Sequence, residues 1–234
     1  MLLPDLRRTV LEANLELVRS GLVLFTFGNA SGISREDSLV VIKPSGVPYE
    51  RMKPSDLVVT DLEGKLVEGK LRPSSDLPTH LVLYKAFPKI GGVSHTHSEY
   101  ATAWAQARRL IPCLGTTHAD SFHGPVPVTE ELTDAEIASN YEENTGHVIV
   151  RAFRDADYSS IPAVLVANHG PFAWGPDPLA SAHNAAILES VARMAYFALV
   201  INPQARAIGR CLHDKHFLRK HGKDAYYGQS KERK

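Results

Sequence analysis

Residues 91–100 read GGVSHTHSEY, a short apolar run that ends on two histidines, His95 and His97. Runs of this kind are typical of buried strands. Because alternate residues of a strand point to the same face, the spacing His-x-His places two imidazoles side by side. A third histidine, His169, follows another apolar run in AVLVANHGPF, residues 163–172. Three imidazoles at strand ends predict a site for zinc or a similar divalent ion that works as a Lewis acid.

The other histidines have a simpler interpretation. The chain has 11 histidines, and a lone histidine is usually a hydrogen-bonded polar residue that ligates nothing. That interpretation is kept for His118, His123, His147, His183 and His221, and for His80 unless the fold brings it into the site.

Hydrophobic periodicity on either side of these runs predicts a layered fold. It indicates helices over residues 4–20, 72–88, 98–107, 177–200 and 214–220, a helix that opens with a capping box at Thr133, and strands over 39–44, 57–68 and 163–167. The two runs within 57–68 surround Glu63-Gly64 and predict a hairpin. Strands that form hairpins in part and alternate with helices in part favour a mixed or antiparallel sheet covered by helices. The fold class is α/β, without a Rossmann signature or the repeated units of a barrel.

Length and charge restrict the function classes. With 234 residues, 44% of them hydrophobic, the chain can bury one sizeable core, and we expect a single domain over residues 1–234. The 26 basic and 26 acidic residues are interspersed, so no charged surface for nucleic acid or an anionic membrane is expected. Only the tail is basic, and Lys231, Arg233 and Lys234 are expected to form a solvated end.

The sequence also predicts a cytoplasmic protein. No apolar stretch is seen to approach the roughly 18–20 residues of a membrane span, and the charged N-terminus does not fit a signal peptide. Cys113 and Cys211 are too few for a disulfide framework and are not spaced as a metal pair, so reduced thiols are expected.

Three short polar motifs have the composition of an anion-binding site. Glycine-rich turns expose backbone N–H groups, and serines at a helix start add hydroxyls to the positive end of its dipole. The candidates are Gly28 and Asn29 in TFGNASG, Ser45 and Gly46 in IKPSGV, Ser74 and Ser75 in RPSSD, and the cationic Lys43. Taken singly, the first two motifs are also ordinary turns, the serines are ordinary helix caps, and Lys43 fits a surface position.

Two carboxylates complete the candidates. Asp76 directly follows the paired serines, so it is either a fourth metal ligand or a residue that caps the helix and complements its dipole. Asp120, in the small-residue loop GTTHADSFHG, is either an acid or base or a solvated loop residue.

Seven segments together resemble a known family. They are TFGNASGI, IKPSGVPYE, RPSSDLPTHLVLYKAFP, SHTHSEYATAWAQA, TTHADSFHG, ANHGPF and the tail DKHFLRKHG followed by AYYGQ. In order and spacing they resemble the L-ribulose-5-phosphate 4-epimerases of the class II aldolase/adducin family, over essentially the whole chain. The resemblance implies a three-layer αβα fold with a central mixed, mainly antiparallel sheet.

The resemblance also implies a reaction and a cofactor. Zinc, with Mn²⁺ as another candidate, is expected on His95, His97, His169 and Asp76. Carbon 4 of L-ribulose 5-phosphate is expected to be inverted by retro-aldol cleavage and aldol re-addition, which gives D-xylulose 5-phosphate. The phosphorylated ketopentose would be held at its phosphate by Gly28, Asn29, Lys43, Ser45, Gly46, Ser74 and Ser75. Such an enzyme serves pentose catabolism, for example of arabinose.

Proton transfer is assigned by the resemblance to Asp120 and Tyr227, with His216 as an accessory residue. Tyr227 would come from a neighbouring subunit of a homotetramer, reached by a tail from about residue 221 to 234. The alternative for Tyr226 and Tyr227 is a pair of aromatic residues that docks the tail, and Tyr226 is expected to do only that.

Two alternatives remain open within this resemblance. A class II aldolase acting on fuculose or rhamnulose phosphate is one, although a glutamate is expected there in place of Asp76. A non-catalytic module like the adducin head is the other, although such modules lose the metal ligands that are present here.

Overall fold

The computed structural model describes residues 1–228 of the chain, so the basic tail with Lys231, Arg233 and Lys234 lies outside the described residues. The helices are α1 (Pro4–Arg19), α2 (Leu77–Ala86), α3 (Glu99–Gln106), α4 (Thr116–Ala119), α5 (Asp134–Ala138), α6 (Tyr141–Ala152), α7 (Pro178–Ile201) and α8 (Arg210–His221), with single 3₁₀ turns η1 (Tyr49–Arg51) and η2 (Pro54–Asp56). The strands are β1 (Asn29–Ser34), β2 (Leu39–Ile42), β3 (Val58–Asp61), β4 (Leu66–Glu68), β5 (Gly92–His95), β6 (Ala163–Val166) and β7 (Gly170–Gly175).

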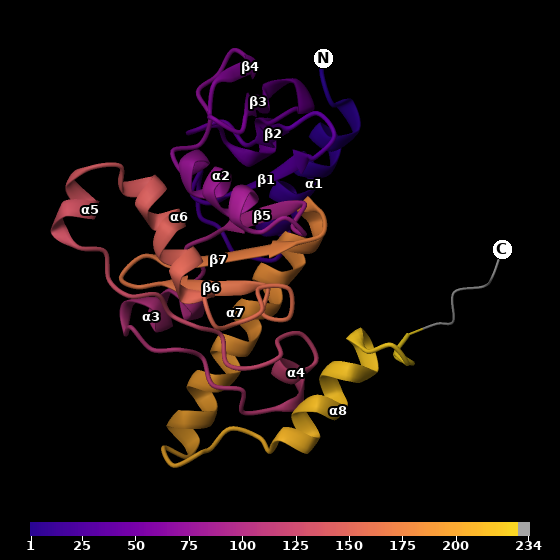
Figure 1. Cartoon of the computed structure of the whole chain (residues 1–234), viewed down its shortest axis with the longest axis vertical. Coiled ribbons are helices and arrows are strands. Elements are labelled where there is room, and N and C mark those ends of the chain that lie inside the picture. The colour runs from indigo at the N-terminus through magenta and orange to yellow at the C-terminus, as the bar shows by residue number, and fades with distance from the viewer. Residues whose placement is uncertain (229–234) are drawn as a thin grey trace.

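The seven strands form one sheet in the order β4-β3-β2-β1-β5-β7-β6 (Figure 1). Every pairing between these strands is antiparallel, which confirms the mainly antiparallel sheet. In the described residues the parallel part of the expected mixed sheet is limited to an isolated bridge between Val128 and Leu165, which covers the outer edge of β6. Coverage by this loop keeps the edge strand from presenting unpaired N–H and C=O groups.

Helices cover both faces of the sheet and make three layers. On one face α7 lies along β5 and β7 and packs against α1 and α3. On the other face α2 and α6 pack together, and Phe87 from the end of α2 contacts Trp174 of β7 with ring centroids 5.3 Å apart. The α/β architecture predicted from the alternation of strands and helices is confirmed.

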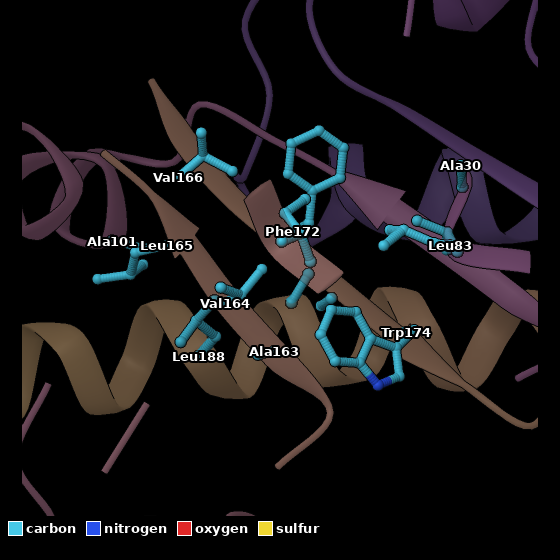
Figure 2. Close-up of a cluster of buried hydrophobic side chains, with 14 of the residues drawn as sticks. Ala30, Leu83, Ala101, Ala163, Val164, Leu165, Val166, Phe172, Trp174 and Leu188 are labelled. Atoms are coloured by element: carbon cyan, nitrogen blue, oxygen red, sulfur yellow. The ribbon is translucent and has the colours of Figure 1, made fainter. Parts of the chain in front are cut away.

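The core lies between the layers. Figure 2 shows Phe172 and Trp174 of β7 beside Val164 of β6, with Leu188 reaching the sheet from α7. These four side chains are essentially inaccessible to solvent. Burial of large apolar side chains contributes roughly 1.5–3 kcal/mol each relative to exposure, which stabilises the packing of β6, β7 and α7.

The longest helix corrects one expectation from the sequence. Within α7 an 18-residue window reaches a mean hydropathy of 1.4, so by length and composition this helix is apolar enough to span a membrane. Its buried residues, which include Ala182, Ala185, Leu188 and Ala192, recur at helical spacing and face the sheet. Only 28% of that window is buried, so one side of α7 packs against the core while much of its remaining apolar surface faces solvent.

Most other predicted elements are present. The first helix, the hairpin formed by β3 and β4, the capping box at Thr133 and the stop of α7 before Pro203 are all confirmed. Of the possible caps of α2, Asp76 occupies the cap position but its side chain makes no capping hydrogen bond, while Ser74 Oγ accepts a long hydrogen bond of 3.4 Å from the Asp76 N–H. The final helix begins at Arg210, one turn before the expected start.

Candidate metal centre and anion pocket

The three histidines predicted to share an ion lie together. His95 is the last residue of β5, His97 follows two residues later, and His169 lies in the turn between β6 and β7. Their ligand atoms all lie within 4.8 Å of one another, and the Nε2 atoms of His95 and His97 are 3.0 Å apart. A tetrahedral zinc with nitrogen ligands about 2.0–2.1 Å away needs donor atoms about 3.3 Å apart. This cluster therefore has dimensions suited to a divalent metal ion.

The register of the sheet produces this arrangement. Asn29 of β1, His95 of β5 and Phe172 of β7 are direct partners across three neighbouring strands, so their side chains share one face. The Phe172 ring stacks on the His95 ring with centroids 4.1 Å apart. Asn168, in the turn before His169, adopts a left-handed conformation with φ 62°, which asparagine tolerates better than most residues.

The orientation of His95 leaves a lone pair for an ion. Its Nδ1 lies 2.9 Å from the Pro171 carbonyl oxygen, to which it donates its N–H. The Nε2 atom is then the unprotonated nitrogen and faces the other imidazoles. A second ring nitrogen bound to a backbone carbonyl is the usual support of a metal-ligating histidine.

Burial keeps the other two imidazoles neutral. Loss of solvent lowers the pKa of His169 to about 3 and, together with the neighbouring His95, lowers the pKa of His97. Metal ions bind the unprotonated imidazole, so neither ring needs to lose a proton at neutral pH. The donor chemistry of the three side chains therefore fits zinc or a similar ion.

Asp76 lies beside this cluster. The group of side chains whose ligand atoms lie within 4.8 Å contains the three histidines, and in the described residues Asp76 is not a member of it. The Asp76 carboxylate instead accepts a hydrogen bond of 2.6 Å from the amide of Asn29. Burial opposes ionisation of Asp76, but the nearby imidazoles and the Asn29 hydrogen bond hold its pKa below the ordinary value. Its role as fourth ligand stays a prediction.

A cavity of about 480 Å³ joins the histidines to the anion motifs. We call it the histidine pocket. All seven residues predicted to bind the substrate or its phosphate line it, together with the four predicted metal ligands: Gly28, Asn29, Lys43, Ser45, Gly46, Ser74, Ser75, Asp76, His95, His97 and His169. The structure thus brings these eleven residues, from five separate segments, to one place.

Two glycines are needed at the wall of the histidine pocket. Gly28 has φ +74° and Gly46 has φ +69°, both in the region that disfavours other residues. A Cβ atom on Gly28 would also lie 2.9 Å from the His95 carbonyl oxygen, whereas a Cβ on Gly46 would meet no atom within 4 Å. The turn at Gly28 therefore depends on glycine for both conformation and space.

Lys43 brings a buried positive charge into the histidine pocket. Its side chain is almost fully inaccessible, and within the described residues no carboxylate lies close enough for a salt bridge. The ammonium donates to the Thr26 carbonyl oxygen at 3.1 Å and lies 4.7 Å from the centre of the Tyr49 ring. Burial lowers the pKa of Lys43 to about 8, and the charge of Asp76 opposes that change. An anionic group in the pocket would stabilise this cation.

Sequence reasoning missed several residues of the pocket. Tyr141, the first residue of α6, lines the wall, and its hydroxyl lies 3.3 Å from His169 Nδ1. Thr26, Phe27 and Glu142 line it as well. None of them stands in a metal or phosphate motif, and the position of α6 beside the pocket depends on its packing against α2 and β6.

The predicted acid and base lie elsewhere in the chain. Asp120, at the end of α4, accepts hydrogen bonds from Arg219 at 3.0 and 2.7 Å and lies 3.0 Å from His216 Nδ1. Arg219 also lies 5.1 Å above the ring of Tyr227. We call Asp120, His216, Arg219, Lys220 and Tyr227 the α8 cluster.

Within one chain the α8 cluster and the histidine pocket are separate. Asp120 lines a different hollow, of about 560 Å³, which contains none of the three histidines. The expectation that Asp120 is a solvated loop residue is wrong, because its side chain is 14% exposed and paired with Arg219. Burial opposes its ionisation, but the hydrogen bonds from Arg219 and His216 lower its pKa.

Several proteins of known structure resemble this chain over most of its length. An L-fuculose 1-phosphate aldolase superposes with a TM-score of 0.77 at 27% identity, covering 91% of this chain and 94% of that one. L-fuculose-1-phosphate aldolase from Thermus thermophilus gives 0.67 at 24% identity, with 85% and 97% covered. YgbL from Klebsiella pneumoniae, described as a putative aldolase/epimerase/decarboxylase, gives 0.70 at 23% identity, with 90% and 97% covered. Residues 8–196 match the sequence model of the Class II Aldolase and Adducin N-terminal domain, and the chain therefore belongs to the class II aldolase and adducin family.

Proposed function

We propose that this protein is a metal-dependent L-ribulose-5-phosphate 4-epimerase that interconverts L-ribulose 5-phosphate and D-xylulose 5-phosphate in the cytoplasm. The observation that carries the proposal is the histidine pocket, in which a nitrogen donor set adjoins a buried cation and two glycine turns. A phosphorylated ketose has the matching ends, an anionic phosphate and a carbonyl with a neighbouring hydroxyl. The resemblance over seven segments, with an aspartate at position 76, supports the epimerase in particular.

The phosphate would lie at the end of the pocket formed by Lys43, Ser45 and Ser75. The lysine supplies charge, while the serine hydroxyls and the backbone of the turn at Gly46 supply hydrogen bonds. Fixing the phosphate there orients the carbon chain toward the histidines. Positioning of this kind lowers the entropic cost of reaching the transition state.

His95, His97 and His169 would hold the metal, with Asp76 as the fourth ligand. When bound, a divalent ion supplies Lewis-acid stabilisation of the negative charge that develops on the oxygen atoms of the substrate. The Asn29 amide nitrogen holds the Asp76 carboxylate on this side of the pocket. The oxygen of the same amide, Asn29 Oδ1, is buried without a hydrogen-bond partner in the described residues.

The reaction needs a proton acceptor and a proton donor on opposite sides of carbon 4. A base removes the proton of the hydroxyl on carbon 4, the bond between carbons 3 and 4 breaks, and its electron pair moves to the carbonyl. Glycolaldehyde phosphate then rotates its aldehyde group and is attacked on its other face, and an acid returns a proton to the oxygen. Asp120 and Tyr227 are the candidates for these roles, with His216 as an accessory.

We propose that these residues come from a neighbouring copy in a homotetramer. Within one chain they belong to the α8 cluster, which lies apart from the histidine pocket. Helix α8 has no buried residue and stands away from the sheet beside α4 (Figure 1). A segment placed in this way is suited to reach another subunit.

An aldolase acting on a deoxysugar 1-phosphate is the second candidate. It is favoured by an L-fuculose 1-phosphate aldolase of known structure that is 27% identical over most of both chains. An aldolase would release its aldehyde, whereas an epimerase retains and re-adds it. The two activities are therefore separated by their products.

The experiment is product analysis with the purified full-length protein loaded with zinc. With L-ribulose 5-phosphate we expect D-xylulose 5-phosphate to appear by NMR, without glycolaldehyde phosphate that an aldehyde reagent can trap. With L-fuculose 1-phosphate we expect no dihydroxyacetone phosphate. Release of dihydroxyacetone phosphate without epimerisation would assign the chain to the aldolases.

Metal analysis tests the third possibility, a non-catalytic module. We expect zinc or another divalent ion to be retained, and His97→Asn to abolish both its retention and the activity while the circular dichroism spectrum stays unchanged. Full activity in this variant would disprove the metal assignment. His147→Gln, which replaces an exposed histidine on α6, is the matched control and should behave as wild type.

A further inference from the structure

A second group of metal-binding side chains lies at the base of α8. His213 and Asp214 are in the second turn of that helix, and His123 follows α4 in the chain. Their ligand atoms all lie within 4.8 Å of one another, as in the histidine pocket. No sequence pattern indicates this group, because the residues lie some ninety positions apart and match no spacing motif.

The distances suit a small ion. His123 Nε2 lies 2.9 Å from Asp214 Oδ1, and His213 Nδ1 lies 3.6 Å from the same oxygen. Donor atoms around a tetrahedral zinc are about 3.3 Å apart, a value between these two. Small rotations of the side chains would therefore suffice to bind an ion.

One hydrogen bond selects the tautomer of His213 that can bind a metal ion. Its Nε2 lies 3.2 Å from the Phe122 carbonyl oxygen and donates its N–H there. The lone pair is then on Nδ1, the atom that faces Asp214. As for His95, a ring held by a backbone carbonyl through one nitrogen is prepared to ligate through the other.

His123 is also held in place. Its ring packs against those of His213 and Phe217, with centroids 4.8 and 4.6 Å away. Asp155 and Asp157 line a hollow that also contains His123 and add negative charge to it. Arg210 is almost fully exposed and lies 3.4 Å from the other oxygen of Asp214, so it does not compete for Oδ1, the oxygen that faces the two imidazoles.

We propose that His123, His213 and Asp214 form a second divalent-metal site, of the zinc class, that fastens α8 to the segment after α4. Two imidazole nitrogens and a carboxylate favour zinc over magnesium or calcium, and the exposed side leaves room for water as the fourth ligand. This site is independent of the catalytic proposal, because it shares no residue with the histidine pocket or the α8 cluster.

A metal ion bound at this site would restrict the position of α8. Because the helix has no buried residue, polar and aromatic contacts with the segment around α4 hold it in place. A metal ion that joins the two segments binds only when they are docked, so it stabilises the docked state by mass action. His216 lies on the same helix and Tyr227 follows it, so both would be held in a narrower range of positions.

The experiment uses the full-length protein in the His97→Asn background, which removes zinc from the histidine pocket. After metal removal, each variant is dialysed against zinc and the bound metal is measured by elemental analysis. Hydrogen exchange of residues 210–221 is recorded with and without zinc. We expect one zinc ion per chain in the background variant, and slower exchange in α8 when zinc is present.

Addition of His213→Gln should remove that ion and the zinc-dependent slowing of exchange. Asp214→Asn should do the same, and serves if the first substitution unfolds the chain. His147→Gln is the matched control, because His147 also lies beside a carboxylate, Glu143 at 4.0 Å, but without a third ligand. Equal zinc binding in the His213→Gln and His147→Gln variants would overturn the proposal and leave His123 as a hydrogen-bond partner of Asp214 only.

Discussion

Lys43 shows how a single residue can combine stability cost and function. A lysine that is buried without a salt bridge loses hydration, and the lowered pKa expresses that cost. Such a cation is retained where an anion binds it, because the ligand then replaces the missing counter-charge. The residue type and its neighbours, Ser45 and Gly46, were predictable as an anion site, whereas its depth depends on the packing of Tyr49 over the side chain.

The pH dependence of substrate binding tests this role of Lys43. The charged form binds phosphate, and its pKa of about 8 means that the charge is lost as the pH rises through that value. We expect kcat/KM for the sugar phosphate to fall above pH 8, by about tenfold per pH unit once the lysine is neutral. In Lys43→Arg the guanidinium stays charged, so the fall should move to higher pH even though activity at pH 7 is reduced. An unchanged alkaline limb in Lys43→Arg would assign the titration to another group.

Gly28 makes a second prediction at this scale. In Gly28→Ala the new methyl group meets the His95 carbonyl oxygen and the φ of +74° becomes strained, so both stability and metal affinity should fall. Gly21→Ala is the matched control, because Gly21 has φ +68° but nothing within 4 Å of its Cβ. Strain alone should cost about 1–2 kcal/mol in the control, and Gly28→Ala should cost clearly more. Urea unfolding measures the loss of stability in both variants. Equal losses would show that the contact between the new methyl group and the His95 carbonyl oxygen does not reduce stability.

At the scale of elements, two strands that carry the site are the ones that periodicity did not predict. β1 reads NASGIS and β7 reads GPFAWG, with small residues and glycines where strands usually have branched ones. Both lie inside the sheet with buried residues on both faces, so no alternation of polar and apolar residues marks them. The small residues of β1 and β7 let α1 and α7 pack close to the sheet. This requirement comes from the packed layers and leaves no local sequence pattern.

Helix α8 provides the prediction for this scale. In Tyr227→Phe the ring can still lie under Arg219 and Lys220, while the hydroxyl that is proposed to transfer a proton is lost. We expect turnover to fall by roughly 10²–10⁴-fold, with zinc content and KM nearly unchanged. Tyr226→Phe, which alters the neighbouring exposed tyrosine, is the control and should keep full turnover. Equal turnover in both variants would show that Tyr227 only docks the tail.

For the whole molecule, sequence reasoning located the histidine pocket, but it did not show how that pocket and the α8 cluster are related. Spacing and motifs identified eleven residues that the fold gathers into one cavity. The acid and base candidates are local to α4 and α8, and no pattern within one chain indicates which pocket they serve.

The exposed half of α7 adds an observation at this scale, because it presents a row of large apolar residues to solvent: Met194, Tyr196, Phe197, Val200 and Ile201. An exposed apolar surface of this kind is a candidate contact surface for the proposed homotetramer.

Mixing of inactive subunits tests whether neighbouring chains complete each site. His97→Asn damages the histidine pocket and Tyr227→Phe damages the α8 cluster. A site that combines the native pocket of one chain with the native α8 cluster of its neighbour would therefore be intact. If the two variants are co-expressed in equal amounts and assemble at random, half of the pockets are native and half of the neighbouring tyrosines are native. About a quarter of the wild-type activity should then return. Co-expression of His97→Asn with His169→Asn is the control, since both lesions lie in the same half and no intact site can form. Activity that stays at the level of this control would place the proton-transfer group within the chain that holds the metal.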